Sequence, residues 1–130
     1  MEFVNLTPHA IVLHTNEGEK KVDPSGEVAR VSTSETPAGV IGSIPAVVRS
    51  MGNATGIPSP KPGVVYLVSA MVLSALEVSG NLRQDVAAPD TGPTAVRNDK
   101  GLIQGVKRLI VLKPITQKEA TDWVARFLSQ

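Results

Sequence analysis

The fold of this chain is decided by residues 64–78, which read VVYLVSAMVLSALEV. The first five, Val64–Val68, form an unbroken run of apolar and β-favouring residues, which is typical of a strand buried on both faces in the middle of a sheet. Ser69 is a favourable N-cap, and Ala70–Val78 is rich in the helix formers Ala, Met and Leu. Because this segment has no polar face and Gly80-Asn81 follows it as a stop signal, we expect a buried central helix over Ala70–Val78.

Upstream of this stretch, β-favouring runs separated by turn residues predict an antiparallel meander with one wet face. Pro8 lies between the first two runs and lacks an amide donor, which predicts either one kinked strand or two short strands. The runs are Phe3–Leu6, Ala10–Leu13, Lys20–Val22 and Glu27–Val31. Ser32–Gly39 is predicted to be a loop and Gly52–Gly63 an irregular loop, because both segments are rich in Ser, Thr, Pro and Gly. Ala46–Met51, which lies between them, is predicted to be a short strand.

Downstream, Thr94–Arg97 and Leu102–Leu112 are predicted strands joined by the hairpin connection Asn98–Gly101. Thr116 and Glu119 then form a capping box, after which apolar residues recur on one helical face. These are Ala120, Trp123, Val124, Phe127 and Leu128. We therefore expect a single α+β domain over residues 1–130, with a mainly antiparallel sheet, one buried central helix and a C-terminal amphipathic helix. The apolar stripe of that last helix also predicts a homo-oligomer.

The composition argues against several classes of function. With 42% hydrophobic and 19% charged residues, the 130-residue chain has the balance of one globular domain. Its net charge is +1 and only 3% of its residues are aromatic, so we expect no nucleic-acid partner. It has no cysteine and two histidines, so we expect no metal site and no cofactor. No secretory signal and no apolar stretch of roughly 20 residues is present, which predicts a cytoplasmic protein without a membrane partner.

The segment 81–98 concentrates polar side chains between apolar elements and is the richest candidate site. Arg83 and Arg97 are suited to hold a diphosphate, because a guanidinium binds phosphate oxygens bidentately. Asp85 and Asp90 are candidates to accept hydrogen bonds from ribose hydroxyls, and Thr91 offers a hydroxyl. Asn98 completes the set as a sugar-binding amide. The alternative is that Arg83 pairs with Asp85 or Asp90 and only holds a long loop in shape.

Two further residues are candidates for ligand binding. His9 follows Thr7-Pro8 and is suited to act as an acid, a base or a ligand-gripping imidazole, although an ordinary loop hydrogen bond is the simpler interpretation. Tyr66 in the buried strand is either a core residue with one hydroxyl partner or a surface on which a base stacks. Complete catalytic signatures are absent: the sequence has no phosphate-binding G-x-x-x-x-G-K-[ST] loop, no G-x-G-x-x-G and no G-x-S-x-G.

Four short motifs are shared with a set of small proteins from phages, prophages and actinobacteria, most of them known only as hypothetical proteins. The motifs are Asn5-Leu6-Thr7-Pro8-His9-Ala10-Ile11, Tyr66-Leu67-Val68-Ser69, Arg83-x-Asp85 with Pro89, and Val96-Arg97-Asn98-x-x-Gly101-x-Ile103-x-Gly105. The chain resembles this set over nearly its whole length. It departs from the pattern at Val106, where many relatives have Cys, and in a longer Asp90-Thr91-Gly92 insertion.

In size and in its arginine-bearing loop the chain is also similar to the Thoeris anti-defence proteins, which sequester cyclic ADP-ribose isomers. The resemblance implies a phage-type anti-defence protein, located in the host cytoplasm, that binds a small phosphate-bearing nucleotide without turnover. The signal would be cyclic ADP-ribose-like or a cyclic oligonucleotide. Two alternatives remain open, a phage structural or protein-interaction module, and a small nucleotide hydrolase that uses His9 and Asp85 as acid and base.

Overall fold

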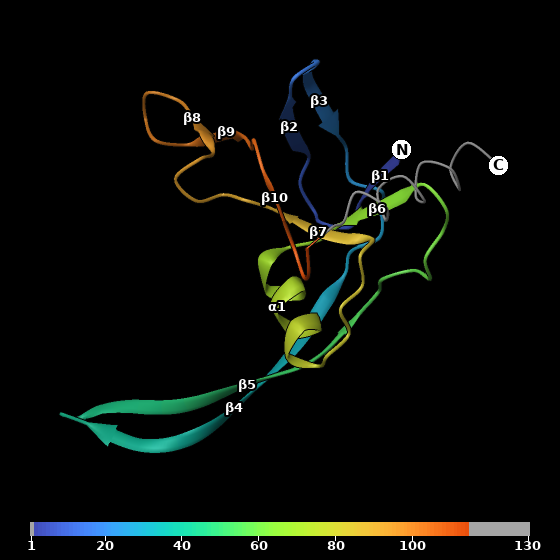
Figure 1. Ribbon diagram of the computed structural model, residues 1–130. Helices are drawn as coiled ribbons and strands as arrows, with labels where there is room; N and C mark the ends of the chain where they lie inside the picture. Colours follow the sequence, from blue (N-terminus) through green and yellow to red (C-terminus); the bar gives the residue numbers. More distant parts are fainter. Residues whose placement is uncertain (1, 115–130) are drawn as a thin grey trace.

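The computed structural model describes residues 2–114, and its centre is a mixed four-stranded sheet (Figure 1). The strand order is β1-β6-β7-β10, with β6 parallel to both of its neighbours and β10 antiparallel to β7. All four residues of β6 are buried, which confirms the central strand predicted from the apolar run. The bounds are β1 Glu2–Asn5, β6 Val64–Leu67, β7 Val86–Pro89 and β10 Leu109–Val111.

Helix α1 (Ala70–Val78) connects β6 to β7 and has the predicted bounds. The Ser69 hydroxyl caps it by accepting a hydrogen bond from the Val72 amide at 3.3 Å. Val72 and Leu76 are buried against one face of the sheet, so the predicted buried helix is confirmed on this side. Its other side is not covered within the described chain, because Met71 and Val78 are exposed.

Two short hairpins cover the opposite face of the sheet. Leu13 and Val22 from the first hairpin pack with Leu67 of β6 and with Val106, which follows the second hairpin. Backbone hydrogen bonds join the two hairpins, from the His14 amide to the Val106 carbonyl at 2.8 Å and from the Val106 amide to the Val12 carbonyl at 2.9 Å. The hairpins are β2 (Ile11–Thr15) with β3 (Gly18–Val22), and β8 (Val96–Arg97) with β9 (Ile103–Gly105).

A third hairpin, β4 (Arg30–Ile41) with β5 (Ile44–Thr55), projects away from this core as a long arm (Figure 1). Here the sequence prediction was wrong. The predicted loop Ser32–Gly39 belongs to β4, and the predicted short strand Ala46–Met51 is part of a strand of 12 residues. Ser and Thr are tolerated in exposed strands, and proline is tolerated at sheet edges, so their local loop signal was overridden by pairing across the hairpin.

The arm turns at Gly42-Ser43, where both residues have positive φ, 53° and 72°. Two consecutive residues with positive φ are the mark of a type I′ turn, whose twist matches that of paired strands. Register shifts between Val31 and Thr33 and between Pro37 and Gly39 bend the ladder without ending it. The predicted irregular loop Gly52–Gly63 is therefore strand as far as Thr55 and irregular only beyond it.

The α+β class is confirmed for residues 2–114, which are rich in strands and contain the single helix α1. Of the six strand pairings in this part of the chain, four are antiparallel, but the two parallel pairings at the sheet centre were not predicted. Within the same residues no helix has the length and apolar character needed to cross a membrane. The predicted C-terminal amphipathic helix, with its capping box at Thr116, lies outside the described residues.

Candidate functional site

The Asn5–His9 motif forms a tightly hydrogen-bonded loop at the end of β1. The Asn5 side chain is buried and makes four hydrogen bonds, which uses its full capacity. Its Nδ2 donates to the carbonyl oxygens of His9 (2.7 Å) and Val22 (3.0 Å), and its Oδ1 accepts from the amide (2.9 Å) and hydroxyl (2.7 Å) of Thr7. His9 is exposed and contributes its backbone carbonyl to this network. The motif therefore shapes the loop and ties β1 to β3.

Arg83 and Asp85 form a bidentate ion pair just before β7. The guanidinium donates from Nε to Asp85 Oδ1 at 2.9 Å and from Nη2 to Oδ2 at 2.6 Å. Its Cζ atom lies over the Tyr66 ring, 5.8 Å from the ring centroid. Tyr66 is buried, and its hydroxyl donates to the Ser59 carbonyl at 3.3 Å. The structure thus has the loop-bracing pair that the sequence left open as an alternative, and it brings three of the predicted residues together.

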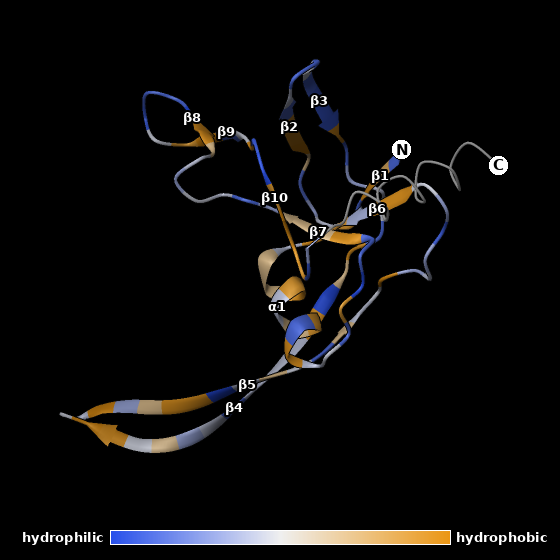
Figure 2. Ribbon diagram, viewed as in Figure 1, coloured by the Kyte–Doolittle hydropathy of each residue, from blue (hydrophilic) through white to orange (hydrophobic). Residues whose placement is uncertain are grey.

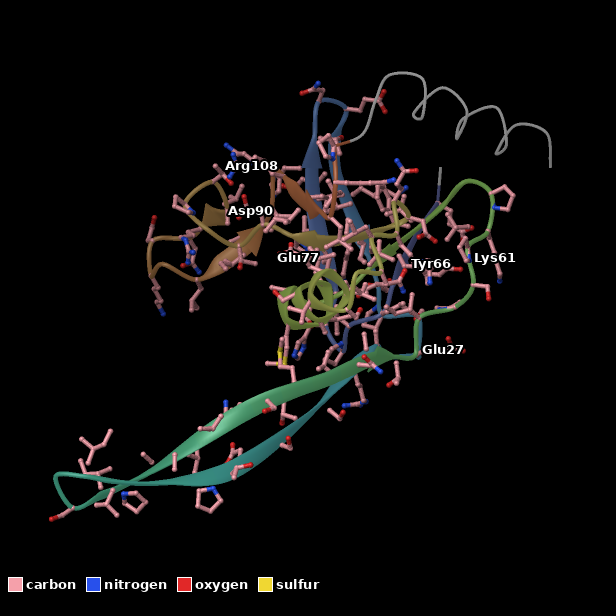
Figure 3. The ribbon with its side chains drawn as sticks, turned by 60° about the horizontal axis from the view of Figure 1, so that its bottom comes forward. Glu27, Lys61, Tyr66, Glu77, Asp90 and Arg108 are labelled. Atoms are coloured by element: carbon pink, nitrogen blue, oxygen red, sulfur yellow. The ribbon has the colours of Figure 1, made fainter. Side chains whose placement is uncertain are left out.

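Asp90 follows β7 and holds a second set of contacts. Its carboxylate accepts from the Gly92 amide at 3.0 Å and from the Thr94 hydroxyl at 3.4 Å, and it pairs with Arg108 Nη2 at 2.6 Å and Nε at 3.0 Å. The pKa of Asp90 is lowered, first by the Gly92 amide and then by Arg108. Figure 3 shows Asp90 and Arg108 at one end of the sheet and Tyr66 with Lys61 at the other.

The loop that contains β8 includes three of the predicted site residues, Thr91, Arg97 and Asn98. Arg97 donates from Nη1 to the Gly101 carbonyl and from Nη2 to the Thr91 carbonyl, both at 2.9 Å. Asn98 Oδ1 accepts from the amides of Lys100 (2.9 Å) and Leu102 (3.0 Å). All three predicted residues are exposed and use their contacts to shape this loop.

The structure does not bring the two predicted phosphate-binding arginines together. Arg83 precedes β7, whereas Arg97 lies in β8 beyond the other end of β7. Four strand residues rise roughly 13 Å, so the two guanidiniums serve different loops. Within one chain they do not form a joint diphosphate clamp.

A cavity of about 400 Å³ lies where the loops entering β6 and β7 meet. Of the eight predicted residues, Arg83 and Asp85 line it, with Tyr66 beneath the Arg83 guanidinium. Its other lining residues are Gln84 and the four consecutive residues Pro60, Lys61, Pro62 and Gly63. Sequence reasoning missed Lys61 and Gln84, although three prolines and three glycines between Gly52 and Gly63 marked this loop as unusual.

Two kinds of chemistry are at issue in the described residues, a metal site and the acid–base pair of His9 and Asp85. Residues 2–114 contain no group of three or more His, Asp or Glu residues placed to hold a metal ion. His9 and Asp85, the predicted acid and base, belong to separate hydrogen-bond networks at Asn5 and at Arg83. Comparisons of this chain with protein-family models, with curated proteins and with solved structures found no match.

Proposed function

We propose that this chain is a protein-interaction module that assembles with further copies of itself through the β4–β5 arm. The observation that carries the proposal is the arm tip, residues 36–48. It contains no charged residue, and its five large apolar side chains are 52–73% exposed. They are Val40, Ile41, Ile44, Val47 and Val48. Figure 2 shows these hydrophobic stretches along the end of the arm, far from the core. Exposed apolar clusters of this kind mark interaction sites.

Both faces of the arm tip are apolar. Successive residues of a strand point to opposite faces. Val47 and Val48 are successive residues of β5 and are both more than half exposed. A hairpin that only lay on a surface would need one apolar face and one polar face. The tip is therefore suited to be covered on both sides, as it would be between the arms of neighbouring copies.

The composition of the arm favours a protein partner. The tip has no Lys or Arg to contact nucleic-acid phosphates. Residues 30–55 contain no Trp or Tyr, the residues that are enriched where proteins contact the membrane–water interface. Glu35 and Arg49, which flank the tip, pair with each other at 2.8 Å and need no charged partner.

A second copy of the arm fits these properties best. Two apolar faces can pack as stacked sheets about 10 Å apart without leaving an unmatched charge. Two strands of 12 residues rise about 40 Å and are about 10 Å wide, so the two faces of the whole arm offer on the order of 800 Å², the usual area per partner of a stable interface. The apolar tip provides about half of this area. Pro37 and Pro45 each remove an amide donor, which disfavours edge-to-edge pairing and favours contact through the faces.

Light scattering coupled to size exclusion tests this function. We expect an oligomer at micromolar concentration, and a dissociation constant at least about a hundredfold higher in Val47→Asp/Val48→Asp, because each carboxylate would be buried without a partner. The control is Val78→Asp, the same type of substitution at a single 81% exposed position on α1. Val78→Asp should assemble like the unaltered chain. A monomeric unaltered chain at high micromolar concentration would overturn the proposal.

Sequestration of a small nucleotide is the second candidate function, and one observation favours it: Arg83 and Asp85 line the cavity of about 400 Å³, within the usual size range of ligand sites. The test is a thermal-shift screen over cyclic ADP-ribose-like and cyclic oligonucleotides. A ligand at 100 times its dissociation constant adds about 2.7 kcal/mol of stability. Heating the complex and recovering intact ligand separates sequestration from hydrolysis.

A further inference from the structure

We infer that the cavity between residues 60–63 and 83–85 is a binding site for the phosphate of a small phosphate ester, with Lys61, Gln84 and the free edge of Arg83 as its hydrogen-bond donors. The inference deepens the second candidate function, on which it rests, and is independent of the arm. It assigns the anion to Lys61 and to Gln84, the middle residue of the Arg83-x-Asp85 motif, neither of which was a predicted site residue.

Arg83 is held rigidly with part of its donor set unused. Asp85 occupies Nε and Nη2, and Arg83 Cζ lies over the Tyr66 ring, 5.8 Å from its centroid. Within residues 2–114, Arg83 Nη1 has no hydrogen-bond acceptor. It is also not fully buried, so a ligand in the cavity can reach it. A guanidinium fixed on two sides loses little rotamer entropy when a ligand binds its third side.

Gln84 supplies the second donor. Its Nε2 is the one buried side-chain nitrogen or oxygen without a hydrogen-bond partner in the described part of the chain. Such groups are rare in folded proteins and call for an explanation, which a ligand oxygen in the adjoining cavity would provide. The terminal torsion of Gln is soft, so a small rotation can present Nε2 to a ligand.

Lys61 supplies the third donor and the net charge. No ion pair of Lys61 is found among residues 2–114. The carboxylate of the cavity, Asp85, is already bound by Arg83, so the cavity lining has no unpaired carboxylate. A cavity with spare donors and one unpaired positive charge selects a ligand rich in acceptors, which describes a phosphate group. The Pro60 ring extends the lining with an apolar surface for the body of the ligand.

Calorimetry on the full chain with three probes tests the site. AMP carries the phosphate and a flat ring, adenosine carries only the ring, and inorganic phosphate only the anion. We expect AMP to bind at least about tenfold more tightly than adenosine, since charge-assisted hydrogen bonds distinguish them. Inorganic phosphate should bind more weakly than AMP and compete with it, and the opposite order would overturn the assignment to a phosphate ester.

Variants locate the anion. Lys61→Ala and Gln84→Ala should each weaken AMP binding about tenfold, and Gln84→Glu should weaken it further by placing a like charge beside the phosphate. Lys100→Ala removes the same charge from the exposed β8–β9 loop and should leave AMP binding unchanged. Thermal unfolding of each variant shows whether it is folded, and because Lys61 is exposed its variant tests the site even if the Gln84 variants are unstable.

The outcomes separate the inference from the function on which it rests. If AMP binds equally to the unaltered chain and to both alanine variants, the nucleotide site lies elsewhere and the inference fails while the second candidate function stands. If adenosine binds as tightly as AMP, the assignment to phosphate fails. If no phosphate compound binds at millimolar concentration, both the inference and the second candidate function fail.

Discussion

The β6–α1 core and the β4–β5 arm are both rich in valine and other aliphatic residues. In the described chain the core buries these side chains, whereas the arm leaves them exposed. Val64 in β6 is 7% exposed, whereas Val40 in the arm is 68% exposed. Burial of apolar surface stabilises a fold only where another surface excludes the water. The core buries its apolar residues within the described chain, while residues 2–114 leave those of the arm exposed.

The largest effect should come from the core. Leu67→Ala removes a side chain that is fully buried between the sheet and the two short hairpins, and it should lower the free energy of unfolding by about 2–5 kcal/mol in urea denaturation. Val47→Ala in the arm should change it by less than about 0.5 kcal/mol in dilute solution. If the arm is covered by other copies, the loss in Val47→Ala should grow with protein concentration. An equal loss of unfolding free energy in Leu67→Ala and Val47→Ala would contradict the difference in burial between core and arm.

The second-largest loss of stability is expected at the β2–β3 hairpin, which Asn5 ties to the core, unlike the arm. Asn5→Ala removes four hydrogen bonds and releases the contact to the Val22 carbonyl, so we expect a loss of about 2–3 kcal/mol. His9→Ala should cost less than about 0.5 kcal/mol, because His9 contributes only its carbonyl to this loop. A large stability loss in His9→Ala would show that its imidazole has a structural role.

Gly105 lies at the contact between the two short hairpins, which pack on the core, unlike the arm. An added Cβ would lie 2.6 Å from the His14 ring and 3.0 Å from the Val12 carbonyl oxygen. Gly105→Ala should therefore lower the free energy of unfolding by about 1–2 kcal/mol, through overpacking. Removing the ring in His14→Ala/Gly105→Ala should recover part of that loss, which a double-mutant cycle measures. Simple additivity of the two changes would contradict a direct clash.

The smallest effect is the pH dependence of the contacts that join β7 to β10. The folded pKa of Asp90 is lowered below its ordinary value of 3.8. A lowered carboxyl pKa adds stability above the unfolded pKa, and that stability is lost as the pH falls through the folded value. The difference in melting temperature between the unaltered chain and Asp90→Asn should thus be largest near neutral pH and shrink below about pH 4. A constant difference would assign the effect of Asp90 to geometry rather than charge.

The same contrast explains what could be predicted from the sequence. A strand over Val64–Val68, observed as Val64–Leu67, was predicted because an uninterrupted apolar run is a local signal of burial. The helix Ala70–Val78 was predicted because its helix formers follow the N-cap Ser69. The arm was missed because Ser32–Gly39 has the composition of a loop, and its strand conformation depends on pairing with residues 44–55 rather than on local preference. Sequence patterns alone do not provide that register.

The site shows a similar division. The Arg83–Asp85 pair was open as an alternative because the two residues are close in sequence. Lys61 and Gln84 were missed because the residues between them fold into β6 and α1, which brings two distant loops together at one cavity. Asn5 was recognised only as part of a motif, and its buried carboxamide became visible as the centre of that motif only with the structure.

The Gly42-Ser43 turn also has a consequence for how the chain folds. The parallel pairing of β1 with β6 must close a connection of about 60 residues, which is entropically costly and slow. A hairpin with a type I′ turn can form within about 1–10 μs, and zipping β4 to β5 brings residues 29 and 56 close together. With β2–β3 also formed, the effective connection shortens to about 20 residues, which lowers the closure cost by about 1 kcal/mol. The arm then serves as an early local fold that speeds the meeting of the two strands on which the sheet is built.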